Sequence, residues 1–131
     1  MKWLFAAIYL VLVQILHWYL WAYPSSGVFL NTQGPWSLSV PNEAMVVVAL
    51  FIIVAAVFVG YRYKLAWPLP LLFIIASGLS NLADRLRLGG VIDYIDLRVW
   101  PVFNVPDVIM TLAIIYFIIF QMIRRSGQSA R

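Results

Sequence analysis

The sequence contains no cysteine and only one histidine, His17. Without cysteine, disulfide bonds, thiol nucleophiles and metal sites built on thiolates are excluded. Charged residues are also scarce, at 11% of the chain, whereas hydrophobic residues make up 64%. Soluble domains are roughly 45–50% apolar. The composition therefore predicts an integral membrane protein.

Long apolar runs account for most of the chain, and roughly 17–25 apolar residues are enough to cross the hydrocarbon core of a bilayer. We predict an all-α membrane protein with a single integral membrane domain over residues 1–131. It is a four-transmembrane-helix bundle, with helices at about 2–23, 43–61, 65–86 and 106–123. The first run begins like a secretory signal. Its length and the Trp and Tyr residues near its far end predict a retained helix instead.

The basic residues are divided unevenly between the two sides of this bundle. Arg85, Arg87 and Arg98 share one side with all five acids, whereas the other side has no acid and six basic residues: Lys2, Arg62, Lys64, Arg124, Arg125 and Arg131. By the positive-inside rule, both termini are predicted to be cytoplasmic and the acids to face outward. The basic residues form no stripe of the kind that binds nucleic acid, so we predict no nucleic-acid partner.

The outer loop over residues 24–42 has the pattern of a small β-hairpin lying on the extracytoplasmic membrane surface. Residues 31–35 carry turn chemistry. After them, apolar and polar side chains alternate as in a strand with one apolar face: Trp36, Ser37, Leu38, Ser39 and Val40. Asn31 is either a turn former or a binding residue, and the sequence favours neither.

Residues 80–107 hold four of the five acids: Asp84, Asp93, Asp96 and Asp107. Carboxylates between apolar segments are costly to keep, so this cluster indicates a functional site. Both lysines belong to the opposite side, which excludes a Ser-Lys pair, and a Ser-His pair would depend on His17 alone. As a lone histidine among aromatic residues, His17 is predicted to pack rather than bind. Carboxylate chemistry remains. Two aspartates brought together could act on a substrate, one as general base toward water and the other as general acid.

The positions of the aspartates suit these roles to different degrees. Asp107 follows Asn104 and Pro106 at a predicted helix start, where the helix dipole favours a negative charge; acids are common in first turns for that reason alone. Asp93 has apolar neighbours on both sides, and their desolvation would raise its pKa. Asp96 is predicted to be a solvated loop acid.

Asn81, Asp84 and Arg85 lie three and four positions apart, near the outer end of the third helix. Asn81 and Arg85 could donate hydrogen bonds to an extended substrate, or Arg85 could hold neighbouring carboxylates. Alternatively, Arg85 reaches the lipid headgroups with Asp84 as its partner. The spacing alone favours the last interpretation, in which Arg85 reaches the headgroups.

Three segments, 81–86, 90–96 and 103–107, resemble successive signatures of signal peptidase II, the bacterial lipoprotein signal peptidase family. The resemblance implies a four-helix membrane protein and an intramembrane aspartyl endopeptidase, which cuts diacylglyceryl-modified prolipoproteins before the lipidated cysteine. It implies that Asp93, in a V-[VI]-D-[FY]-I motif, and Asp107, in an F-N-x-x-D motif, are the catalytic pair. It also implies a supporting role for Asp84 and four substrate-binding residues: Asn31, Asn81, Arg85 and Asn104.

The chain departs from the family pattern in its first helix and first outer loop. Where the family usually carries D-Q-x-x-K, this chain has Val13, Gln14 and His17, and so lacks both charged residues. The usual N-T-G-A-A-F-S becomes NTQGPWS over residues 31–37, and Ser80 replaces a usual glycine. These changes leave the acid pair intact and bear on how the lipid of a substrate is held.

The resemblance further implies a monomer in the cell (inner) membrane, with its active site near the extracytoplasmic surface. Its partners would be lipidated prolipoproteins and membrane lipid. We predict no cofactor and no metal, since no spacing in the sequence supports one. An alternative is a non-catalytic relative that serves as a membrane binding or assembly component. A small transporter is a second alternative, although it would place acids deeper within the spans.

Overall fold

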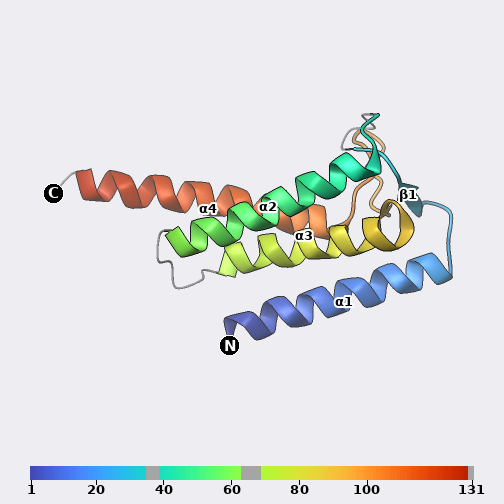
Figure 1. Cartoon of the computed structure of the whole chain (residues 1–131), viewed down its shortest axis with the longest axis horizontal. Helices are drawn as coiled ribbons and strands as arrows, with labels where there is room; N and C mark the ends of the chain where they lie inside the picture. The colour runs from blue at the N-terminus through green and yellow to red at the C-terminus, as the bar shows by residue number, and fades with distance from the viewer. Residues whose placement is uncertain (35–38, 63–68, 130–131) are drawn as a thin grey trace.

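The computed structural model describes residues 1–34, 39–62 and 69–129. Within these ranges the chain forms four helices that run alongside one another (Figure 1), namely α1 (Lys2–Ala22), α2 (Asn42–Arg62), α3 (Leu69–Leu88) and α4 (Val105–Ser129). Each contains a stretch long and apolar enough to cross a membrane. The predicted helical membrane bundle is confirmed.

The bounds of the helices differ from the expected ones mainly at the ends of α3 and α4. The expected start at residue 65 lies outside the described residues, and α3 is described from Leu69 to Leu88. Helix α4 continues to Ser129, although the apolar run of the sequence ends at Ile123, before Arg124 and Arg125. Loss of apolar character ends the membrane span without ending the helix, because the backbone hydrogen bonds do not depend on hydrophobic side chains.

Helix α3 is the centre of the bundle, because it packs against α1, α2 and α4 (Figure 1). One core cluster joins Leu71 and Ile74 of α3 to Ala56 of α2 and Ala113 of α4. A second joins α3 to α1 through Ala6, Leu72 and Ala76. Small residues at such contacts let helix backbones approach closely.

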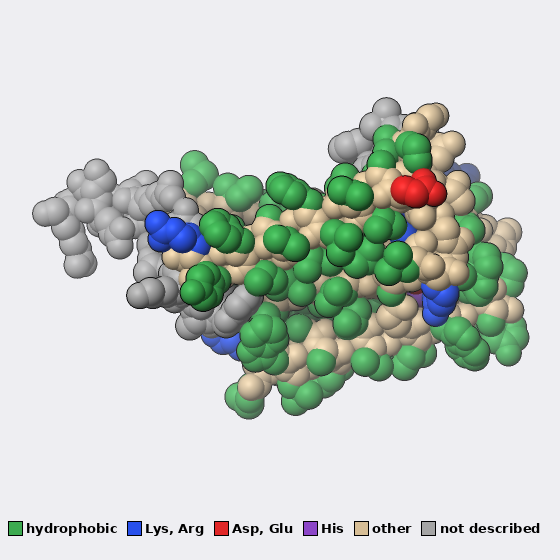
Figure 2. Space-filling model, in the orientation of Figure 1, with side chains coloured by type: hydrophobic (Ala, Val, Ile, Leu, Met, Phe, Trp, Pro, Cys, Tyr) green, Lys and Arg blue, Asp and Glu red, His purple; other side chains and the backbone are tan. Residues whose placement is uncertain are grey.

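The other three helices expose most of their surface. In the α3 span 56% of the residues are buried, against 11–17% in the other spans. On the face shown in Figure 2, hydrophobic side chains cover the length of the helices, while most charged side chains lie toward the two ends. Such an apolar surface is suited to contact with membrane lipid.

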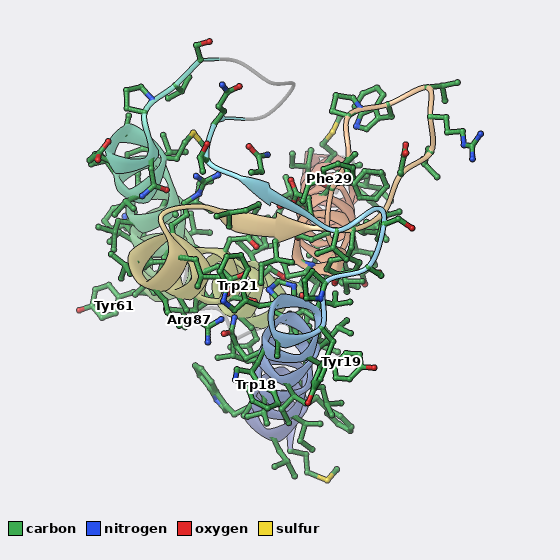
Figure 3. All side chains as sticks on the ribbon, turned by 90° about the vertical axis from the view of Figure 1, so that its right-hand side faces the viewer. Trp18, Tyr19, Trp21, Phe29, Tyr61 and Arg87 are labelled. Carbon is green, nitrogen blue, oxygen red and sulfur yellow. The ribbon has the colours of Figure 1, made fainter. Side chains whose placement is uncertain are left out.

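A small antiparallel sheet lies across one end of the bundle (Figure 3). It pairs β1 (Phe29–Asn31) with β2 (Val91–Asp93), so that Phe29 faces Asp93 and Asn31 faces Val91. A Cβ atom on Gly90 would lie 2.7 Å from the carbonyl oxygen of Asn31, so the close approach requires glycine there. The partner of β1 is thus the segment after α3. Of the second hairpin arm predicted over residues 36–40, residues 36–38 lie outside the described residues.

Candidate active site

The chain returns on itself between the two candidate catalytic aspartates. Asp93 ends β2, and Asp107 lies in the first turn of α4. Between them, Ile95 and Phe103 form an antiparallel bridge in which each backbone N–H donates to the other's carbonyl, at 2.8 and 3.1 Å. This bridge brings the start of α4 back beside the end of β2.

Asn104 links the two aspartates directly. Its Nδ2 donates to Asp93 Oδ1 at 2.9 Å, and its Oδ1 accepts the backbone N–H of Asp107 at 2.9 Å. The second bond is the N-cap interaction that a helix start requires. Asn104 is fully buried, and both ends of its amide are occupied, so its orientation is fixed by the fold.

The other carboxylate oxygen of Asp93 accepts a hydrogen bond from Asn31 Nδ2 at 2.9 Å. The residue is only 3% exposed. Burial raises the pKa of Asp93 to about 6, and the negative charge of Asp107 adds to the rise; hydrogen bonds from Asn31 and Asn104 and the positive charge of Arg85 oppose it. The direction agrees with the expectation from its apolar neighbours in the sequence.

Asp107 is held from α3 rather than from the sheet. Its Oδ1 accepts a hydrogen bond from Asn81 Nδ2 at 2.8 Å. The amide oxygen of Asn81 is buried and accepts no hydrogen bond from the residues that the structure describes. One acceptor beside Asp107 is therefore available to a ligand.

Arg85 holds the surface segments against the end of α3. Its guanidinium donates to Asn42 Oδ1 at 3.1 Å and to the carbonyl oxygen of Gln33 at 3.2 Å. These bonds connect α3 to the first residue of α2 and to the segment after β1. The alternative in which Arg85 reaches outward with Asp84 as its partner is wrong, because Arg85 is buried and Asp84 bonds to other residues.

Asp84 instead forms a buried pair with His17 of α1. His17 Nδ1 lies 2.5 Å from Asp84 Oδ2, and both side chains are fully buried. Arg87, labelled at the end of α3 in Figure 3, donates to Asp84 Oδ1 at 3.3 Å. His17 is thus packed, as predicted, but it also has an acidic partner that we did not predict.

A signal for the pairing of His17 existed in the sequence. Gln14 and His17 lie one turn apart on an otherwise apolar helix, and Ser80 and Asp84 lie one turn apart on α3. In the structure Gln14 Nε2 donates to Ser80 Oγ at 2.9 Å, one turn from the His17–Asp84 pair. Polar residues at matching helical spacing therefore marked the α1–α3 contact.

Five of the six predicted site residues share one hydrogen-bonded arrangement, comprising Asp93, Asp107, Asn31, Asn81 and Asn104. Arg85 acts on Asp93 through its charge. Among the described residues, no group of three His, Asp or Glu side chains is placed to hold a metal ion. The arrangement can bring two carboxylates with different surroundings to one reacting group.

A family model described as Signal peptidase (SPase) II matches residues 26–123 of the sequence. The chain belongs to the signal peptidase II family. Its membership confirms the resemblance predicted from the three motifs, and the four spans make it a multi-pass membrane protein of a protease family.

Curated relatives and solved structures agree with this assignment. The chain is 35% identical to the lipoprotein signal peptidase of Moorella thermoacetica over 95 residues, which cover 69% of this chain and 63% of the relative. It is 44% identical to that of Pelotomaculum thermopropionicum over 73 residues, covering 51% of this chain and 47% of the relative. The chain thus spans about half to two thirds of the length of these relatives.

Two solved structures, each described as a bacterial membrane enzyme, share the fold. One superposes with a TM-score of 0.83 at 22% identity, covering 96% of this chain and 90% of that structure. The other has a TM-score of 0.76 at 20% identity, with coverage of 92% and 91%.

Proposed function

We propose that this protein is an intramembrane aspartyl endopeptidase of the signal peptidase II type. It removes signal peptides from diacylglyceryl-modified prolipoproteins and cuts before the lipidated cysteine. Family membership supports the reaction class. The observation that carries the residue assignment is the single buried amide of Asn104, which joins the carboxylate of Asp93 to the backbone of Asp107.

We assign the two aspartates different roles, with Asp93 as general acid and Asp107 as general base. Burial raises the pKa of Asp93 to about 6, so a larger fraction of it is protonated than of an ordinary aspartate. In this proposal Asp93 donates its proton to the scissile carbonyl oxygen. Asp107 lies at the positive end of the α4 dipole, where a negative charge is stabilised. It takes a proton from the attacking water, whose oxygen bonds to the carbonyl carbon.

Collapse of the resulting tetrahedral species completes the hydrolysis. The carbon–nitrogen bond breaks, and the leaving nitrogen takes the proton held by Asp107. Asp93 regains a proton from the hydroxyl group as the new carboxyl group forms. Water is thereby added across one peptide bond with no covalent enzyme intermediate.

The remaining predicted residues bind the substrate and shape the site. Asn31 and Asn104 orient the carboxylate of Asp93. The unpaired amide oxygen of Asn81 is placed to accept a hydrogen bond from the attacking water or from a peptide N–H. Arg85 holds Gln33, in the segment after β1, through its backbone carbonyl oxygen.

The membrane location supports the choice of substrate. The described acids all lie at the sheet end of the bundle, where β1 and β2 cross it. With the basic residues of the opposite end on the cytoplasmic side, the site faces the extracytoplasmic surface. A lipid-anchored peptide reaches that depth by lateral diffusion. The protein acts as a monomer in the cell membrane, as one domain over residues 1–131, without a cofactor.

The test is a gel-shift assay of a diacylglyceryl-modified prolipoprotein with the purified protein. Asp93→Asn and Asp107→Asn are each expected to lower the rate at least about 100-fold, because general acid and base groups contribute roughly 10²–10⁴-fold. Asp96→Asn is the matched control, since Asp96 is exposed and should leave the rate unchanged.

Cleavage that survives in both variants would contradict the assignment of the catalytic pair. A folded parent that cleaves none of several lipobox sequences would instead favour the non-catalytic relative. The observation that favours a non-catalytic relative is the altered first-helix motif, which has Val13 and His17 where the resemblance leads us to expect charged residues.

A further inference from the structure

A second polar arrangement runs from α1 into the candidate active site. His17 contacts Asp84 through Nδ1, while its Nε2 lies 3.5 Å from the hydroxyl of Tyr94. The same hydroxyl lies 3.3 Å from the backbone nitrogen of Val105, which donates to it. The rings of His17 and Tyr94 also meet edge to face, with centroids 5.6 Å apart.

The contacts of this arrangement fit one pattern of donors and acceptors. Because the Tyr94 oxygen accepts the N–H of Val105, its own hydrogen is available to donate to His17 Nε2. Burial raises the pKa of Tyr94, which keeps that hydrogen in place. Nε2 is then the acceptor of the imidazole, and Nδ1 carries the hydrogen donated to Asp84 Oδ2.

The residues that this arrangement reaches are the neighbours of the catalytic pair. Tyr94 directly follows Asp93, and Val105 lies two positions before Asp107 at the first residue of α4. The N–H groups in the first turn of a helix have no partner within the helix. The Tyr94 hydroxyl therefore ties the end of β2 to the start of α4, and His17 holds that hydroxyl in position.

We propose that His17 is a positioning residue, which acts through Tyr94 to fix the relative placement of Asp93 and Asp107. The inference rests on the proposed function of that pair. It assigns to α1 a task in the reaction beyond packing on α3. An imidazole ring can offer an acceptor nitrogen to the Tyr94 hydroxyl at this place.

Two features separate this role from simple packing of α1. The bond between His17 and Asp84 would by itself join α1 to α3, without any contact to Tyr94. The hydroxyl of Tyr94, in turn, would cap Val105 whether or not His17 accepted its hydrogen. Positioning requires both bonds together, so removal of either one should have the same effect as removal of both.

The closing experiment uses the full chain with Tyr94→Phe, His17→Asn and the double variant. Phe keeps the ring and removes only the hydroxyl. Asn offers a donor near the position of Nδ1 for Asp84 but nothing at the position of Nε2. Each is expected to lower kcat about tenfold with KM within twofold, and the double variant should lose no more than either single one. Tyr116→Phe, on the exposed surface of α4, is the control.

Hydrogen exchange at the Val105 amide gives a readout that needs no substrate. Exchange should be protected in the parent and faster by about tenfold in both single variants.

If the parent cleaves and both variants keep its kcat, the positioning role is overturned. Additive losses in the double variant overturn it as well. If the parent does not cleave, the proposed function fails, and unprotected exchange at Val105 in the parent then refutes the tether independently. Should His17→Asn fail to fold, Tyr94→Phe decides on both readouts.

Discussion

Two buried aspartates at the same end of the bundle have opposite surroundings. Asp84 is fully buried between the imidazole of His17 and the guanidinium of Arg87. Asp93 is nearly as buried, but its hydrogen bonds come from the neutral amides of Asn31 and Asn104. Amides satisfy the geometry of a carboxylate without offsetting its charge. The first acid thus has basic partners, whereas the second is bonded by neutral amides and has a pKa that burial raises.

The two aspartate clusters have different roles, although both lie at the same end of the bundle. The Asp84 cluster joins α1 to α3 and forms part of the scaffold. The cluster around Asp93 and Asp107 contains two carboxylates near each other, and among the described residues their side-chain hydrogen bonds come from amides. Such a site is less stable than one in which a cation bonds to each carboxylate, and in the proposed mechanism this eases proton transfer.

The largest expected effect comes from the same substitution made in both clusters. Asp84→Asn removes the charge that His17 and Arg87 contact, and should lower the free energy of unfolding by about 2 kcal/mol, the usual cost of losing hydrogen bonds to a charged group. Asp93→Asn removes a charge that burial disfavours, and should stay within about 1 kcal/mol of the parent. Unfolding in detergent, followed by circular dichroism, measures both. Equal destabilisation by the two changes would remove the distinction between the clusters.

The next effect concerns the pH dependence of cleavage. If protonated Asp93 is the general acid, the rate should fall as pH rises through about 6, because the protonated fraction declines there. Asn31 donates to the carboxylate and lowers this pKa, so Asn31→Leu should raise it and move the decline upward by about one pH unit. The pH profile of kcat for parent and variant is the measurement. A decline that moves to lower pH in Asn31→Leu would contradict the assignment of Asp93 as the general acid.

The smallest expected effect distinguishes the two partners of Asp84. The Arg87 side chain is 45% exposed, and its contact with Asp84 spans 3.3 Å. Exposed ion pairs contribute about 0–1 kcal/mol, so Arg87→Gln should change the unfolding free energy by less than about 1 kcal/mol. Unfolding measured beside Asp84→Asn gives the comparison. A loss as large as that of Asp84→Asn would mean that Arg87, rather than His17, stabilises the acid.

Much of the arrangement could be predicted because it depends on local sequence. The spans follow from composition, and Asn104 with Asp107 has the form of a helix start, which the structure confirms as an N-cap bond. The raised pKa of Asp93 follows from its apolar neighbours. These features need no knowledge of which helices meet.

The pairing of Asp84 with His17 and the contacts of Arg85 could not be predicted, because they depend on which helix faces contact each other. Helix α1 is apolar on nearly every side, so hydrophobic periodicity cannot show which face contacts α3. Neighbouring residues on a helix point in different directions. Asp84 therefore faces His17 while Arg85 turns toward Asn42 and Gln33, and their adjacency in the sequence suggested a pair that does not form.

The amide of Asn104 has one consequence for the chemical lifetime of the protein. Its oxygen caps α4 and its nitrogen donates to Asp93. Slow hydrolysis of that amide to a carboxylate would keep the cap, since a carboxylate oxygen accepts the same N–H. The other oxygen would then meet Asp93 with a second negative charge in place of a donor. Deamidation at this single position would leave the fold intact and disable the proposed active site, so the protein would lose activity without unfolding.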